Sequence, residues 1–132
     1  MRMWMVDPKI LCRRHLLGEH VELHMFVGSI NKKISLDGYA KNSLVEVHNI
    51  KSRHSQLVKE MKARGMNHKS PLPKFTVFKF GKVNKKDNIK ELSNRCSECK
   101  AMIESINKRY ERNYYSIFSD IDYYFFITSI CP

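Results

Sequence analysis

Three stretches of the chain repeat apolar residues at the three- and four-residue spacing of a helix, and polar segments separate them. The first stretch predicts a helix over residues 8–28, with Asp7 as its cap and Pro8 at its first position. A second helix is predicted over residues 47–64 and a third over residues 88–107. The inward faces comprise Ile50, His54, Leu57, Val58 and Met61 in the second helix, and Leu92, Cys96, Cys99, Met102, Ile103 and Ile106 in the third.

The connections between these helices carry turn and loop signals. Residues 31–42 are expected to form a polar link with a turn at Asp37. Residues 75–83 alternate only loosely between apolar and polar, which is weak support for a strand. Residues 116–132 form an aromatic C-terminal tail. The pattern predicts a compact, single all-α domain over the whole chain, with about three main helices and long irregular connections.

Composition narrows the choice of partner. The 132 residues carry 24 Lys and Arg against 13 Asp and Glu, a formal net charge of +11. This excess favours a polyanionic partner, of which nucleic acid is the commonest. No stretch approaches the roughly 20 apolar residues of a membrane span, and the N-terminal residues lack a signal-peptide pattern. We expect a cytoplasmic protein, neither secreted nor membrane-bound, with four reduced cysteines.

The first predicted helix concentrates ionisable residues. His15, Glu19 and Glu22 fall on one face of it, at steps of four and three residues. A carboxylate on this face, beside Arg13 and Arg14, could act as an acid or base in a basic cleft. The alternative is that both glutamates only balance nearby arginines on a solvated face. Spacing alone favours this alternative.

Two residue pairs have spacings found at metal sites. His20 and His24 stand four residues apart, which can place two ligands on one helix turn. Such pairs are more often ordinary surface or core residues, so a metal-dependent nuclease that uses them is a minor alternative. Cys96 and Cys99 form a C-x-x-C pair without a second such pair, and buried thiols are the better interpretation.

Basic and aromatic residues gather toward the C-terminus. Tyr114 and Tyr115, near Arg109 and Arg112, could stack on bases and hold phosphates. The alternative is that the tyrosines seal the core against the first helix. Further candidates for phosphate contact are the lysines Lys69 and Lys100. The first of these is also explained as part of the loop that ends the second helix.

Several short motifs together suggest a family. Arg2, the segment HLLGEHVEL with Glu22, then Gly28 and then KARGMN resemble the pyrimidine-dimer DNA glycosylase/AP-lyase family, the phage-type endonuclease V repair enzymes. The resemblance covers most of residues 1–70 and resumes weakly at NKRYERNYY. It implies an all-α monomer without cofactor or metal, whose N-terminal segment threads between the first and third helices. The implied partner is double-stranded DNA with a damaged or abasic site.

The resemblance also implies the catalytic residues. The nucleophile would be the backbone α-amine of Met1, with Glu22 working beside it, while Arg2 and His15 match an arginine and a histidine of the family. The implied reaction excises a damaged pyrimidine, in particular a cyclobutane pyrimidine dimer, through a Schiff base and then cuts the strand by β-elimination. An α-amine, with a typical pKa of about 7.7–8.0, is a better nucleophile at neutral pH than a lysine at about 10.4. The alternative function is a non-catalytic basic DNA-binding module.

The chain departs from the family pattern at two places. In the family the arginine follows Met and a small residue, and processing exposes the amine of the small residue. Here Met1 directly precedes Arg2, whose bulk blocks removal of Met, so retention of Met1 leaves the amine one residue before the arginine. Val21 and Met25 stand where the family has arginines that grip the strand. The lesion preference is therefore left open.

Overall fold

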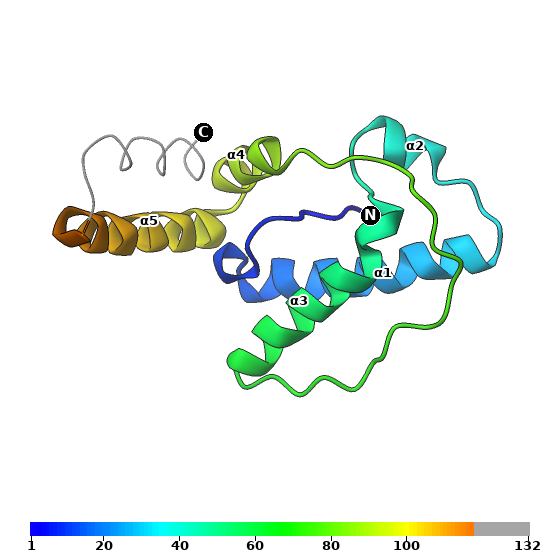
Figure 1. The fold of residues 1–132 in the computed structure, drawn as a ribbon, viewed down its shortest axis with the longest axis horizontal. Helices are drawn as coiled ribbons and strands as arrows, with labels where there is room; N and C mark the ends of the chain where they lie inside the picture. The colour runs from blue at the N-terminus through cyan, green and yellow to red at the C-terminus, as the bar shows by residue number, and fades with distance from the viewer. Residues whose placement is uncertain (118–132) are drawn as a thin grey trace.

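Two helices that pack across each other form the centre of the fold. The computed structural model describes residues 1–117, and the side chains of residues 1–109. α1 (Arg13–Asn31) packs against α3 (Ile50–Ala63), as Figure 1 shows. Apolar residues at helical spacing are buried in α1, namely Leu16, Leu23, Phe26 and Val27. In α3, Ile50, His54, Leu57 and Met61 are buried, which confirms most of the inward face that the sequence predicts for this helix. Full burial stabilises such a side chain by about 1.5–3 kcal/mol.

Shorter helices and irregular connections complete the described chain. In order they are η1 (Pro8–Ile10), α2 (Asp37–Lys41), η2 (Val47–Asn49), α4 (Lys85–Arg95) and α5 (Ser97–Ile117). α5 packs on η1 and α4 and projects away from the crossing helices (Figure 1). Residues 1–117 contain no strand, which confirms the all-α prediction and agrees with the weak case for a strand over residues 75–83. Among these residues, no helix is both long and apolar enough to span a membrane.

The first predicted helix is interrupted by contacts from α3. Asp7 caps η1, with its Oδ1 3.0 Å from the Lys9 amide nitrogen, but α1 begins only at Arg13. Leu11, between the two elements, is extended and buried. Arg64 donates to the carbonyl oxygens of Pro8 and Leu11 at 3.1 and 2.7 Å. The arginine thus satisfies backbone groups that a continuous helix would have paired internally.

The third predicted helix is two helices that meet at Cys96. α4 ends at Arg95 and α5 begins at Ser97, because Cys96 is extended, with φ −132° and ψ 110°. Its side chain is buried against Cys12, from the start of α1, and Cys99 of α5. A short helix, α2, also replaces the turn expected at Asp37. The prediction of a polar link over residues 31–42 was therefore correct in polarity but wrong in structure.

Gly81 allows the long connection after α3 to pass close to Val45. Its φ is +83°, and a Cβ at this position would lie 2.1 Å from the carbonyl oxygen of Val45. We expect Gly81→Ala to lower the free energy of unfolding by about 2 kcal/mol or more, because left-handed strain adds to a collision with backbone. Urea unfolding measures the change. Gly18→Ala is the control, because no atom lies within 4 Å of its Cβ position, and a similar loss in both variants would contradict the explanation.

Candidate active site

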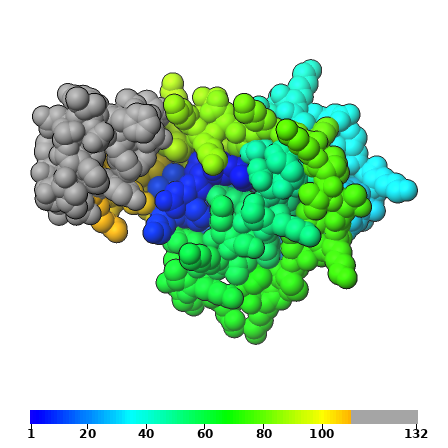
Figure 2. Space-filling model, in the orientation of Figure 1, coloured from blue at the N-terminus to red at the C-terminus, as the bar shows by residue number. Residues whose placement is uncertain are grey.

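The N-terminal segment, residues 1–7, runs through the fold without forming a helix or a strand. Figure 2 shows the blue N-terminal residues at the surface, between the yellow-green α4 and the teal start of α3. Met3, Trp4 and Val6 are buried. The Met3 amide donates to the carbonyl oxygen of Leu44 at 2.7 Å, and Asn88 Nδ2 donates to that of Trp4 at 2.8 Å. The segment therefore lies between helices, as the resemblance implied.

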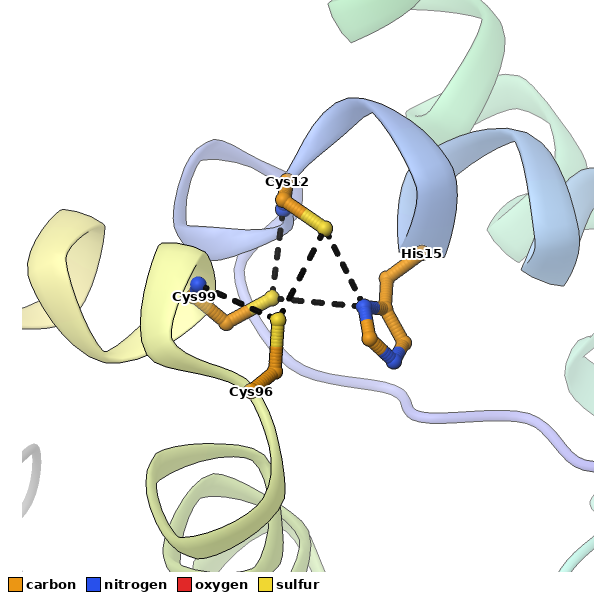
Figure 3. Close-up of side chains that lie close together, drawn as sticks. All are labelled: Cys12, His15, Cys96 and Cys99. Atoms are coloured by element: carbon orange, nitrogen blue, oxygen red, sulfur yellow. Dashed lines mark hydrogen bonds between the residues drawn. The ribbon is translucent and has the colours of Figure 1, made fainter.

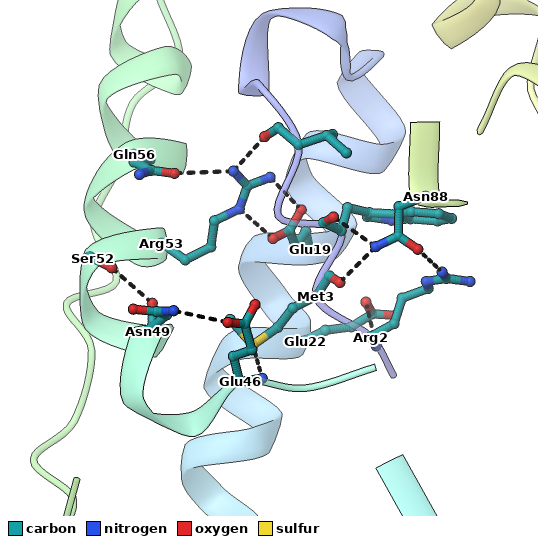
Figure 4. Close-up of polar contacts among 12 residues, drawn as sticks. Arg2, Met3, Glu19, Glu22, Glu46, Asn49, Ser52, Arg53, Gln56 and Asn88 are labelled. Carbon is teal, nitrogen blue, oxygen red and sulfur yellow. Dashed lines mark hydrogen bonds and ion pairs between the residues drawn. The ribbon is translucent and has the colours of Figure 1, made fainter. Parts of the chain in front are cut away.

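Glu22 meets this segment at its free end. The side chain is half-buried on α1, and its Oε2 accepts a hydrogen bond from the Arg2 amide nitrogen at 3.1 Å (Figure 4). The Met1 nitrogen is one residue further along, within about 3.6 Å of that amide nitrogen by backbone geometry. The fold thus brings close together the two residues that the resemblance marks as catalytic, Met1 and Glu22, which are 21 positions apart in the sequence.

The Arg2 side chain is held by α4 and does not extend into solvent. Its Nη2 donates to Asn88 Oδ1 at 2.7 Å, its Nη1 pairs with Glu91 at 3.0 Å, and its guanidinium lies 3.8 Å from the centroid of the Trp4 ring. These contacts fix the backbone of the residue next to Met1. Arg2 was expected among the DNA-binding residues, and in this structure its contacts orient the terminus.

Glu19 has a different environment from Glu22. It is 1% exposed and forms a two-pronged ion pair with Arg53 of α3, with 2.8 Å between its Oε1 and Arg53 Nη2. Arg53 is also 1% exposed and donates to the carbonyl oxygen of Val6 at 2.6 Å. Figure 4 shows this arginine joining α1, α3 and the N-terminal segment. The interpretation of Glu19 as a balancing charge on a solvated face was wrong.

Loss of this arginine should destabilise the fold strongly. We expect Arg53→Met to lower the free energy of unfolding by about 3–5 kcal/mol, because it leaves the Glu19 carboxylate buried without a partner. Denaturant unfolding followed by circular dichroism measures the change. The double variant Glu19→Met/Arg53→Met should recover much of the loss, since it removes both buried charges. A surface control is Arg95→Met, whose half-exposed pair with Glu91 should be worth less than about 1 kcal/mol.

The predicted His20–His24 pair belongs to a larger histidine cluster, made of His20, His24, His54 and His68. The His20 ring lies 4.9 Å, centroid to centroid, from each of the other three rings. Burial, together with the nearby histidines, lowers the pKa of His20 to about 4, so it is neutral at neutral pH. The metal-binding atoms of His20, His54 and His68 lie within 4.8 Å of one another. The histidine cluster contains no carboxylate. Around the axis of α1, position 20 lies about 200° from position 22, the position of Glu22.

Three of the cysteines lie beside His15, in a cysteine–histidine cluster made of Cys12, His15, Cys96 and Cys99. The prediction of buried thiols at positions 96 and 99 is confirmed. Burial lowers the pKa of His15, and Arg14 and Arg95 lower it further. His15 Nδ1 lies 3.1 Å from Cys12 Sγ. This histidine, expected to support DNA binding, therefore faces sulfur atoms.

The remaining candidates for DNA contact are distributed over several elements. The exposed ones are Arg13 and Arg14 at the start of α1, Lys69 after α3, and Lys100 and Arg109 on α5. The side chains of Arg112, Tyr114 and Tyr115 lie outside the described residues. Val21 and Met25, which flank Glu22 in sequence, are 55% and 49% exposed. The surface beside the carboxylate is therefore apolar where the family has arginines.

Sequence reasoning missed the residues that hold the terminus in place. Asn88 and Glu91 bind the Arg2 side chain but carry no motif, and Asn88 shares the buried face of α4 with Leu92. Arg53 resembles any other basic residue of a helix, although it is fully buried. Cys12 gave one usable signal, because Cys12 and His15 have the same x-x spacing as Cys96 and Cys99.

Comparison with known proteins gives the class of the chain. The family model described as "Pyrimidine dimer DNA glycosylase" matches residues 1–74, more than half of the 132 residues, so the protein is a DNA repair glycosylase. The chain belongs to the pyrimidine dimer DNA glycosylase family. The match includes Met1, Arg2 and Glu22 and ends before α4. No curated protein and no solved structure matches the chain.

Proposed function

We propose that this glycosylase excises a damaged pyrimidine, in particular a cyclobutane dimer, with the α-amine of Met1 as nucleophile, and then cuts the strand as an AP lyase with Glu22 as its acid–base group. The observation that carries the proposal is the 3.1 Å hydrogen bond from the Arg2 amide to Glu22, which sets the carboxylate next to the first residue. The proposal takes Met1 as the mature N-terminus.

In the first stage, the Met1 nitrogen displaces the damaged base from C1′ of the sugar. The lone pair of the neutral Met1 nitrogen attacks C1′ of the damaged nucleotide, and the C1′–N bond breaks with its electron pair leaving on the pyrimidine, which takes up a proton. The C1′–O4′ bond then opens and O4′ gains a proton, which leaves a protonated imine between C1′ and the Met1 nitrogen. The Glu22 carboxylate stabilises the positive charge that develops at C1′.

The second stage cuts the strand. Glu22 removes a proton from C2′, which the adjacent iminium carbon makes acidic. The electron pair of that C–H bond forms a C2′–C3′ double bond as the C3′–O bond breaks, and the phosphate leaves with the bonding electrons. Water then hydrolyses the imine and releases Met1. Every step uses groups from residues 1–22, which lie within the part of the chain that matches the family.

Access to C1′ requires DNA distortion and phosphate contacts. A sugar inside a duplex is shielded, so binding should bend the DNA and move a nucleotide out of the stack. The exposed arginines at positions 13 and 14 stand at the start of the helix that carries Glu22. Together with the net charge of +11, they favour salt-sensitive binding to the DNA backbone.

Borohydride trapping tests the proposal directly. Untagged protein is incubated with duplexes that contain an abasic site or ultraviolet damage, and borohydride reduces any imine to a stable amine. We expect a covalent protein–DNA adduct whose peptide map places the DNA on Met1. An adduct on a lysine would exclude the α-amine as nucleophile. Salt-sensitive binding with neither adduct nor nicking is the result expected of a non-catalytic DNA-binding module.

A further inference from the structure

The cysteine–histidine cluster joins two parts of the chain that are far apart in sequence. Cys12 and His15 come from the start of α1, and Cys96 and Cys99 come from the break between α4 and α5. Figure 3 shows the four side chains converging on one point from opposite sides. All three cysteines are buried and none is in a disulfide. Their three Sγ atoms and a ring nitrogen of His15 lie within 4.8 Å of one another.

Two of the separations between these atoms are close to those of a tetrahedral metal site. Zinc binds sulfur at about 2.3 Å and histidine nitrogen at about 2.0–2.1 Å, which places neighbouring ligand atoms roughly 3.5–3.8 Å apart in a tetrahedron. Cys12 Sγ lies 3.9 Å from Cys96 Sγ, and Cys99 Sγ lies 3.6 Å from His15 Nδ1. The remaining short pair, Cys12 Sγ and His15 Nδ1, is 3.1 Å apart. Only small side-chain shifts separate these positions from regular coordination.

The backbone around the cluster is arranged for thiolates. Cys12 donates its amide N–H to Cys99 Sγ at 3.2 Å, and Cys99 donates its amide to Cys96 Sγ at 3.4 Å. Donors of this kind favour the charged form of the group that accepts from them. Both Cys12 and Cys96 are extended residues immediately before a helix, so each of the two predicted helices is interrupted beside one of these cysteines.

We propose that Cys12, His15, Cys96 and Cys99 hold a structural zinc ion that fastens α5 to the start of α1. Three sulfur ligands and one imidazole in a tetrahedron suit zinc, and the two-residue spacing within each pair is a zinc-ligand spacing. The protein fills all four coordination positions, so the ion has no open position for substrate and its role is structural. It links the segment that matches the family to helices beyond the match.

Metal analysis of the purified full-length chain tests the proposal without DNA, so its outcome does not depend on the glycosylase mechanism. Protein prepared without chelators should contain about one zinc ion per chain by elemental mass spectrometry. Cys96→Ser should lose most of it, whereas His54→Gln, in the separate histidine cluster, should keep it. Protein free of zinc, or zinc that is retained in Cys96→Ser and lost in His54→Gln, would overturn the assignment.

Two further measurements cover the case in which Cys96→Ser fails to fold. Wild-type protein with cobalt in place of zinc should show sulfur-to-cobalt charge-transfer absorption and the strong visible bands of a tetrahedral site. His15→Cys offers a fourth sulfur, so it should retain the metal and increase the charge-transfer absorption. Weak octahedral bands, or a Cys96–Cys99 disulfide found by mass spectrometry in freshly purified protein that was never exposed to a chelator, would refute the site.

Discussion

Glu22→Gln should slow scission of abasic-site DNA by about 10²–10⁴-fold, the usual contribution of a positioned acid–base group. The amide cannot remove the C2′ proton and brings no negative charge to the iminium. The substitution should disturb little else, because the glutamine oxygen can still accept the hydrogen bond that the Arg2 amide makes at 3.1 Å. Single-turnover cleavage of a labelled abasic duplex measures the loss, and affinity for the same duplex should change by less than about threefold if Glu22 acts in the chemistry.

A matched glutamate controls for the change in charge. Glu104 is exposed on α5, far along the chain from the terminus, so Glu104→Gln alters the net charge equally and should cleave at the wild-type rate. If both variants lose the same activity, the effect arises from overall charge. If Glu22→Gln cleaves normally, the carboxylate has no part in proton removal and the proposed mechanism is wrong.

Blocking the Met1 amine should have a still larger effect. A peptide fused ahead of Met1 turns its nitrogen into an amide, which has no available lone pair for attack at C1′. We expect no borohydride adduct and a fall in cleavage of at least about 10³-fold, comparable to removal of a nucleophile from other covalent enzymes. The added peptide would also have to exit the fold next to Arg2, whose side chain is held by α4.

The reversible form of this experiment separates chemistry from misfolding. A fusion cut directly before Met1 restores the native end, and activity should return with it, while the same peptide at the C-terminus should have no effect. Melting temperature measured before and after cutting reports whether the fold changed. Full cleavage activity in the uncut fusion would remove Met1 from the mechanism, and a lysine nucleophile would then have to be sought.

The local spacing of apolar residues predicted the positions of the two central helices. The spacing of Leu57 and Met61 placed α3 to within a few residues, and the same logic located α1. It failed at Leu11 and Cys96, where both neighbouring helices could have continued. There the deciding contacts come from residues distant in sequence: Arg64 donates to the carbonyl oxygen of Leu11, and Cys12 packs against Cys96. The spacing of apolar residues along the chain carries no information about such contacts.

The candidate site, too, could be predicted only in part from the sequence. Glu22 became identifiable only with Arg2 and the family motifs, since its helix spacing alone ranked it with Glu19. The structure separates the two glutamates by burial, because one pairs with Arg53 in the core and the other accepts from the N-terminal backbone. No sequence pattern distinguishes these roles, as each depends on which helix faces the carboxylate after folding.

The attachment of Arg2 to α4 bears on the order in which the protein is made. Asn88 and Glu91 follow Arg2 by 86 and 89 residues. At roughly 5–20 residues per second, a ribosome needs about 4–18 s to reach them after it has made the N-terminus. During those seconds the first residues have no α4 to bind, and the amine of Met1 is open to enzymes that trim or acetylate nascent chains. The proposed nucleophile is therefore synthesised, and meets any such enzyme, before the helix that fixes its neighbour exists.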